Sequence, residues 1–378
     1  MTLAIREFLK RGDFEPAAVD AFLAERRCPI VEGTTVTFVY RGAADSVFLQ
    51  HWIFGLPSAQ PFTPIAGTDL WFLVQEIPVR SRVEYKLEVH VGAAARLIRD
   101  PLNPDLAHDP FGANSVCSGA EYAVPVWTRS DPEARPGTIE TVRVRSKALG
   151  RDDEVSVYLP ARFRTSRRYA LLVAHDGLDY LRFSSLQTVL DNLIHQGEVA
   201  PLIVALTQSP TRLREYADDE RHARYLVEEL LPALERKYPI AAGTDQRGLM
   251  GASFGAVAAL SVANRYPEQF GRLLLESGSF AFTDIGPSRR GPLFEPVVEF
   301  VNRFREKPSA VAEKMFVSCG IYESLIYENR SLVPIFEQTG MQIRYVEAWD
   351  GHNWENWRDR LREGLSWLFP GAIWMTYE

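Results

Sequence analysis

The sequence predicts two domains: an N-terminal β-sandwich and a C-terminal α/β domain whose mostly parallel sheet carries helices on both faces. Its 378 residues exceed the roughly 250–300 that one hydrophobic core organises. Short β-branched and aromatic runs fill the first third, and strand-like and helical patterns alternate afterwards. A polar stretch rich in Pro and Gly at residues 125–137 separates them. We therefore place the domains at residues 1–130 and 137–378.

The N-terminal part is predicted to begin with one or two short helices. Its first apolar residues recur at helical spacing, at Ile5, Phe8 and Leu9 and again at Val19, Phe22 and Leu23. Partly alternating strand-like runs follow, separated by Gly, Pro and Asp turns, at residues 35–40, 46–52, 70–74 and 83–91. This spacing is typical of an immunoglobulin-like antiparallel sandwich.

The C-terminal part alternates between two patterns. Short apolar runs predict strands at residues 154–159, 169–174, 202–206, 248–250, 272–276, 314–318 and 342–348. Helical patterns lie between or after them, at residues 184–196, 219–237, 254–266, 293–305, 325–339 and 354–368. Strands that alternate with helices form parallel sheets buried on both faces.

Composition excludes several classes of protein. Hydrophobic residues at 46% and charged residues at 24% are ordinary for a globular chain. A net charge of -7 argues against an extended nucleic-acid surface, and no uninterrupted run of about 18 apolar residues predicts a membrane span. Three scattered cysteines favour neither a disulfide framework nor a zinc site, and we expect no metal and no cofactor. The first residues lack a secretion-signal pattern, so we expect a cytoplasmic protein.

The most informative motif lies at residues 249–260, LMGASFGAVAAL, where Gly251, Ser253 and Gly255 form G-x-S-x-G between a strand and a helix. A serine on so sharp a turn needs small neighbours, because its backbone is strained and side chains two residues away would collide. At the helix N-terminus, the dipole and free amides favour a developing oxyanion. Ser253 is therefore the candidate nucleophile, although a tightly packed turn of no catalytic role has the same pattern.

A nucleophilic serine needs a base and an orienting acid. His352 is the candidate base because it alone among the seven histidines follows the last predicted strand. The acid should follow the strand at residues 314–318, where Glu323 and Glu328 are both candidates. We prefer Glu323, which lies in the loop, since Glu328 already falls in a helical pattern. Asp350 is the weaker choice because it is only two residues from the base.

An ester hydrolase also needs amides that bind the oxyanion. The amide of Phe254, next to Ser253, is the first candidate. The loop after the strand at residues 169–174 supplies the second, at Gly177 or Leu178. A plain β-turn explains this loop nearly as well.

With these residues placed, the chain resembles the enterobactin (enterochelin) esterase family, within the esterase D-like α/β-hydrolases. The similarity spans nearly the whole chain. In the C-terminal part it lies at residues 174–180 (AHDGLDY), 212–240, 248–280, 319–332 (CGIYESLIYENRSL) and 350–361 (DGHNWENWRDRL). In the N-terminal part it lies at residues 36–42, 67–73, 83–87, 100–104 and 112–117.

The resemblance implies a cytoplasmic α/β-hydrolase that cleaves the ester bonds of a ferric catecholate siderophore, with Ser253, His352 and Glu323 as its triad. It also places Arg214 near the substrate, where a guanidinium would suit an anionic catecholate. A feruloyl or acetyl esterase acting on carbohydrate is the alternative, and a non-catalytic binding module is a second one. The expected partner is a small ester, with no nucleic acid and no membrane. The sequence leaves open the oligomeric state, a homodimer being one option, and the role of the sandwich.

Overall fold

The computed structural model describes residues 2–283 and 291–372. Its contacts divide the chain into two compact units. The N-terminal unit comprises Met1–Ala123 together with two short segments from much later in the chain, Gly320–Ser324 and Ala348–Asn353. The C-terminal unit comprises Val124–Cys319, Leu325–Glu347 and Trp354–Glu378. The two late segments contain Glu323 and His352, so the candidate acid and base belong to the N-terminal unit.

Two antiparallel sheets build the N-terminal unit. The first has the strand order β1-β2-β6-β5, with β1 (Ile30–Glu32), β2 (Thr35–Arg41), β5 (Thr63–Pro64) and β6 (Leu70–Glu76). The second has the order β4-β3-β7-β10-β9, with β8 paired to β7. Its strands are β3 (Ser46–His51), β4 (Ala59–Pro61), β7 (Arg82–Val91), β8 (Ala94–Ile98), β9 (Leu106–Asp109) and β10 (Gly112–Ser118).

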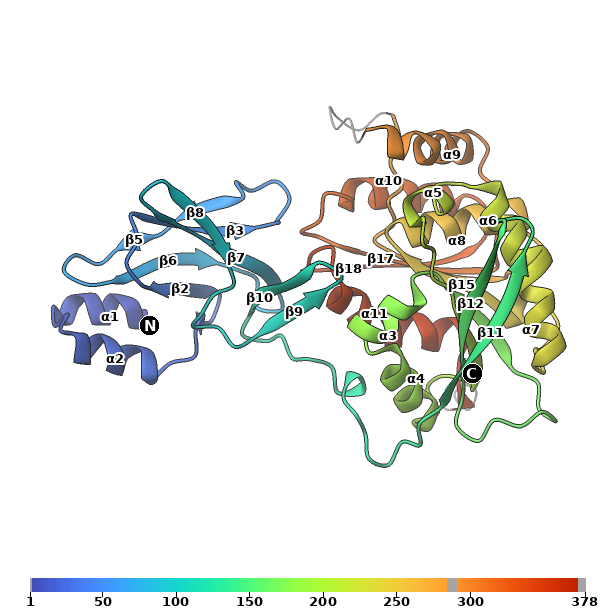
Figure 1. Cartoon of the computed structure of the whole chain (residues 1–378), viewed down its shortest axis with the longest axis horizontal. Helices are drawn as coiled ribbons and strands as arrows, with labels where there is room; N and C mark the ends of the chain where they lie inside the picture. The colour runs from blue at the N-terminus through green and yellow to red at the C-terminus, as the bar shows by residue number, and fades with distance from the viewer. Residues whose placement is uncertain (1, 284–290, 373–378) are drawn as a thin grey trace. The chain divides into compact units, whose positions relative to one another are not determined.

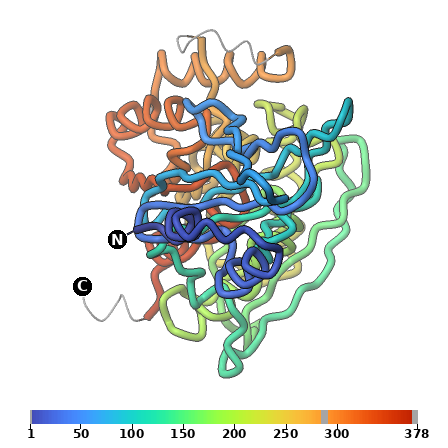
Figure 2. Tube along the Cα trace, turned by 90° about the vertical axis from the view of Figure 1, so that its left-hand side faces the viewer, coloured from blue at the N-terminus to red at the C-terminus, as the bar shows by residue number. Residues whose placement is uncertain are grey.

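Strand β2 shows why this unit needs two apolar layers. Its side chains alternate between faces. Phe38 packs into a core shared with Leu49 and Leu87 of the second sheet, and Val39 packs on the opposite face against α1 (Ala4–Arg11) and α2 (Pro16–Ala24). The two helices lie side by side as the dark-blue coils of Figure 2. The immunoglobulin-like character of the two sheets stays a prediction.

An eight-stranded mixed sheet forms the centre of the C-terminal unit, in the order β11-β12-β14-β13-β15-β16-β17-β18. Strand β12 pairs antiparallel with β11 and β14, and the pairs from β14 to β17 are parallel. The strands are β11 (Thr138–Ser146), β12 (Arg151–Leu159), β13 (Ala170–Ala174), β14 (Leu202–Leu206), β15 (Arg247–Ala252), β16 (Arg272–Glu276), β17 (Lys314–Gly320) and β18 (Gln342–Ala348).

Helices cover both faces of this sheet (Figure 1). On one face α3 (Gly177–Phe183), α4 (Leu186–His195) and α11 (Trp354–Leu368) share an apolar core with the strands. The other face packs against α7 (Leu231–Lys237), α8 (Phe254–Arg265), α9 (Glu295–Glu306) and α10 (Ile326–Glu337), close to the short α5 (Arg212–Glu215) and α6 (Glu220–Arg224). Every residue of β13 and β14 is consequently buried.

The predicted α/β fold is confirmed, and the differences from prediction have local causes. The pattern at residues 219–237 is interrupted by a π-helical turn at Tyr225–Leu230, between α6 and α7. Strand β11 was missed because it lies at the sheet edge, where its outward residues are polar and exposed. Strands β8, β9 and β10 and helix α3 were also missed; β8 consists of largely exposed residues.

Candidate active site

Ser253 lies on a strained turn between β15 and α8. Its backbone has φ 57° and ψ -120°, in a region that L-residues rarely adopt. A Cβ on Gly251 would lie 2.4 Å from the backbone of Gly255, and one on Gly255 would lie 3.2 Å from the Cβ of His175. The amide of Ser253 donates to the carbonyl of Glu276 at the end of β16, 2.9 Å away. Gly251 is therefore needed because the turn brings its Cα against the backbone of Gly255, and Gly255 is favoured because the side chain of His175 lies close to it.

The hydroxyl of Ser253 lies close to the hydroxyl of a second serine. Its Oγ lies 3.1 Å from Oγ of Ser279, and the Ser279 amide donates to the Ser253 carbonyl. Phe254 follows as the first residue of α8, with its side chain buried. The hydroxyl therefore sits at the N-terminal end of a 12-residue helix, where the helix dipole favours negative charge.

Glu323 and His352 form a close pair in the N-terminal unit. Nδ1 of His352 lies 2.6 Å from Oε2 of Glu323, and the other carboxylate oxygen accepts from the Gly320 amide at 2.6 Å. Because a carboxylate only accepts, the neutral form of the imidazole in this contact carries its proton on Nδ1 and has its lone pair at Nε2. The carboxylate is 2% exposed and the imidazole 36%. This arrangement suits a histidine that takes a proton at Nε2.

The other two acid candidates have different surroundings. Asp350 accepts through Oδ1 from the Gly351 amide, from Nδ2 of Asn353 and from Arg82. Burial raises the pKa of Asp350 to about 6, against the lowering effect of Arg82 and these hydrogen bonds. Glu328 is buried within α10. The carboxylate of Glu323 meets the imidazole at hydrogen-bonding distance.

The two predicted oxyanion donors in the loop after β13 have different surroundings. The Gly177 amide donates to the carbonyl of Thr207 at 2.8 Å, so it is already engaged. A Cβ at this position would lie 2.5 Å from Cα of Leu206, which explains the glycine by close approach of β14. Leu178 follows in the first turn of α3 with its side chain partly exposed. Leu178 and Phe254 therefore remain as the donor candidates.

Sequence reasoning missed Arg212 and Asp176. Nε of Arg212 lies 2.7 Å from Oδ2 of Asp176, and its Nη2 donates to the carbonyl of Ala252 at 3.3 Å. It thus joins the loop after β13 to the residue before Ser253. The guanidinium also lies 6.0 Å from the ring of Phe254. Arg214, the predicted substrate contact two residues later, is exposed on α5.

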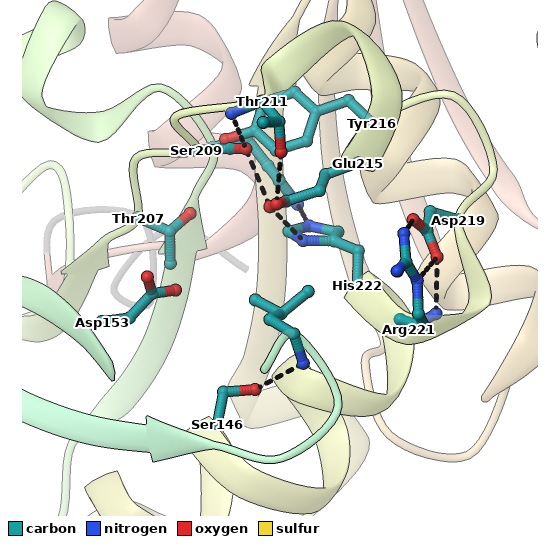
Figure 3. Close-up of polar contacts among 12 residues, drawn as sticks. Ser146, Asp153, Thr207, Ser209, Thr211, Glu215, Tyr216, Asp219, Arg221 and His222 are labelled. Carbon is teal, nitrogen blue, oxygen red and sulfur yellow. Dashed lines mark hydrogen bonds and ion pairs between the residues drawn. The ribbon is translucent and has the colours of Figure 1, made fainter. Parts of the chain in front are cut away.

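Two buried imidazoles support the loop after β13. Nδ1 of His175 is 3.0 Å from the carbonyl of Met250 and must donate to it, so its Nε2 accepts from Nε2 of His222 at 3.1 Å. Burial lowers the pKa of His175 to about 3 and that of His222 to about 4, so both are neutral. Figure 3 shows His222 beside Glu215, whose carboxylate accepts from Ser209 and Thr211. Arg151 also pairs with Glu215.

A cavity lined by His222, Tyr225 and Thr207 lies at this cluster, but its volume is about 10 Å³. That is space for about one water molecule, so the cavity is too small to hold an ester substrate. Within residues 2–283 and 291–372, no group of three or more His, Cys, Asp or Glu side chains is arranged to hold a metal ion. None of the described helices combines the length and apolar character needed to cross a bilayer.

Comparison with known proteins identifies the family. Residues 146–368 match the model of the family described as "Putative esterase". The iron(III) enterobactin esterase of Dickeya dadantii is 26% identical over 289 residues, which cover 72% of this chain and 65%, just under two thirds, of that protein.

Two solved structures share the fold to different extents. The enterobactin esterase of Shigella flexneri, determined in the presence of enterobactin, matches with a TM-score of 0.74 and 21% identity over 95% of this chain and 99% of its own. A ferulic acid esterase of Anaeromyces mucronatus in complex with ferulic acid matches with a TM-score of 0.55 and 17% identity, over 66% of this chain and 97% of its own. The predicted resemblance is confirmed, and the chain belongs to the esterase family that its residues 146–368 match.

Proposed function

We propose that the protein is a serine carboxylic-ester hydrolase with Ser253, His352 and Glu323 as its triad. The strained turn at Ser253 carries this proposal, because such backbone strain persists where a structure over-determines it and is concentrated at functional sites. The Glu323–His352 contact at 2.6 Å supplies the orienting acid and a basic Nε2. Strands β15 and β17, which precede Ser253 and Glu323, run in the same direction in the sheet.

The proposed reaction proceeds in two steps. Ser253 Oγ attacks the ester carbonyl carbon while its proton passes to Nε2 of His352, and Glu323 stabilises the imidazolium. The tetrahedral oxyanion accepts hydrogen bonds from the amides of Phe254 and Leu178. Its collapse breaks the ester C–O bond, and the imidazolium returns the proton to the leaving alkoxide. Water, deprotonated by His352, then hydrolyses the acyl-enzyme and regenerates Ser253.

We propose a ferric catecholate siderophore as the substrate. The extent of the structural matches supports it. The Shigella enterobactin esterase covers 95% of this chain and therefore both units, whereas the Anaeromyces ferulic acid esterase covers 66%. Hydrolysis after uptake of such a siderophore would place the protein in the cytoplasm.

Exposed aromatic residues in the N-terminal unit agree with an aryl substrate. Trp52 and Phe54 are 56% and 46% exposed on the loop after β3, and the Phe54 amide donates to the carbonyl of Tyr322 at 2.7 Å. Trp349 is 46% exposed, three residues before His352, and its ring lies 6.0 Å from that of Tyr322. Rings of this kind can stack on catechol groups. Trp349 therefore lies on the segment that carries the base, and the backbone of Phe54 contacts the segment that carries the acid.

The decisive test replaces the nucleophile. Ser253→Ala should lower turnover of a p-nitrophenyl ester by at least about 10⁴-fold, because the covalent step is lost while binding remains. A fluorophosphonate probe should label the unmodified protein at Ser253 and fail to label the variant, as located by peptide mass spectrometry. Near-normal turnover by Ser253→Ala would reject the proposal. An unmodified protein that resists the probe would favour a binding module instead.

A feruloyl or acetyl esterase remains the second candidate, because a ferulic acid esterase shares the fold over 66% of this chain. Ferric enterobactin and methyl ferulate should be supplied side by side and the products separated by chromatography. We expect a kcat/KM at least about tenfold higher for the siderophore. The opposite ranking would assign the protein to feruloyl esters and leave the triad intact.

A further inference from the structure

We propose that Arg82, at the start of β7 in the N-terminal sheets, is a positioning residue for catalysis that holds the loop of the base His352. This inference rests on the proposed function, because it assigns a role to a residue that acts through His352. It also gives the N-terminal sheets a part in the reaction.

The contacts of Arg82 converge on the residues around His352. Its backbone amide donates to the carbonyl of Trp349 at 2.9 Å. Its Nη1 donates to Oδ1 of Asp350 at 3.2 Å and to Oδ1 of Asn353 at 3.0 Å. One arginine thus binds three of the four residues of the 349–353 loop other than His352 itself. Arginine suits this task because its planar fork holds several acceptors in fixed directions.

Asp350 extends the clamp to the backbone of the loop. Its Oδ1 accepts from the Gly351 amide at 2.7 Å and from Nδ2 of Asn353 at 2.8 Å, the two residues that flank His352. The Asp350 carbonyl accepts from the Tyr322 amide at 3.1 Å, which ties the loop of the base to the segment of the acid Glu323. A shift of Asp350 would therefore disturb both the loop of His352 and the segment of Glu323.

The cluster is buried, which makes its geometry costly to disturb. Arg82 is 4% exposed, and the side chain of Asp350 is 7% exposed. Oε1 of Glu84 accepts a hydrogen bond from Arg82 at 3.2 Å, and its Oε2 accepts one from Nδ2 of Asn114 on β10 at 2.7 Å. Charges this well buried need all their partners, and removing one leaves the others unpaired. The second sheet thus provides a rigid base from which Arg82 reaches the loop.

The experiment compares Arg82→Gln, Arg82→Lys and the control Arg80→Gln in the full chain. Arg80 is 79% exposed, and its partner Glu121 is 57% exposed, so this control removes a guanidinium from the same unit without touching the loop. We expect Arg82→Gln to lower kcat by about 10–100-fold with KM changed by less than about threefold. Lysine should restore part of kcat, because its single ammonium reaches fewer acceptors. Arg80→Gln should remain within about twofold of the unmodified protein.

A double-mutant cycle separates positioning from general destabilisation. If Arg82 acts through the base, Arg82→Gln should have no further effect on the residual turnover of His352→Ala, since coupled residues are not additive. An equal loss in both backgrounds would overturn the proposal, as would unchanged kcat in Arg82→Gln. If Arg82→Gln lacks a cooperative unfolding transition, the same double-mutant cycle is measured with Asp350→Asn in its place. We expect Asp350→Asn alone to lower kcat by about tenfold. An active Ser253→Ala variant would instead reject the proposed function itself, so the two failures can be told apart.

Discussion

The two sides of the proposed catalytic machinery are built in different ways. The serine side depends on residues close together in the sequence, because Gly251, Ser253 and Gly255 create the turn and the helix that follows it. The base side depends on residues far apart. Arg82 and Asp350 are 268 positions apart in the chain and belong to the same contact unit.

This difference has a consequence for how each side tolerates change. A local turn is determined by sterics, so a single methyl group can destroy it. A loop held by a buried ion cluster is determined by electrostatics and hydrogen bonding, so it responds to changes in charge that leave the backbone intact. The two sides should therefore fail in different experiments.

On the base side, the largest effect is expected from removing the charge of the acid. Glu323→Gln should lower kcat by about 10²–10⁴-fold, because glutamine no longer stabilises the imidazolium and can favour the wrong tautomer. Glu328→Gln, in α10, is the matched control and should cost less than about fivefold. Steady-state kinetics on a p-nitrophenyl ester measures both. A larger loss of kcat in Glu328→Gln than in Glu323→Gln would identify Glu328 as the acid and reject the proposed pairing of Glu323 with His352.

On the serine side, Gly251→Ala should destabilise the protein by about 3 kcal/mol or more, because the new methyl would lie 2.4 Å from backbone atoms of Gly255. Gly150→Ala is the control. Its φ is 69° and no atom lies within 4 Å of the added Cβ, so it should cost only about 1 kcal/mol of backbone strain. Urea unfolding compares the two. Equal losses would show that the turn is not determined by sterics.

The same contrast explains what could be predicted from the sequence. The motif around Ser253 and the strand and helix patterns of the C-terminal part depend on local spacing. The roles of Glu323 and His352 stay predictions, made from the strands that precede them. The arginine that contacts Asp176 was harder to identify, since Arg212 and Arg214 lie on one short helix and only the fold shows which of them turns inward. The partnership of Arg82 with Asp350 leaves no local signal, because each residue alone is typical of a strand end or a turn.

Buried histidines should make the serine side sensitive to acid. The pKa of His222 is lowered to about 4 by burial, so the unfolded chain, with a histidine pKa near 6.5, binds more protons between these values. Stability should therefore fall as pH drops from about 6.5 to 4. Relative to His222→Gln, the unmodified protein should lose about 3 kcal/mol over this range in urea titrations. Exposed His195→Gln is the control and should retain the full acid sensitivity.

The base side should show the opposite dependence, at a smaller magnitude. The pKa of Asp350 is raised to about 6, chiefly by burial, so the folded protein binds the proton more tightly than the unfolded chain. Its contribution to stability is present below pH about 4 and is lost as pH rises through about 6. Between pH 4.5 and 7.5, Asp350→Asn should gain about 2 kcal/mol relative to the unmodified protein. Asp152→Asn, at an exposed position of β12, should show no such trend in parallel urea titrations.

A stability difference for Asp350→Asn that does not change with pH would mean that Arg82 and the loop amides hold the carboxylate ionised over the whole range. The clamp would then be stronger than the burial that opposes it.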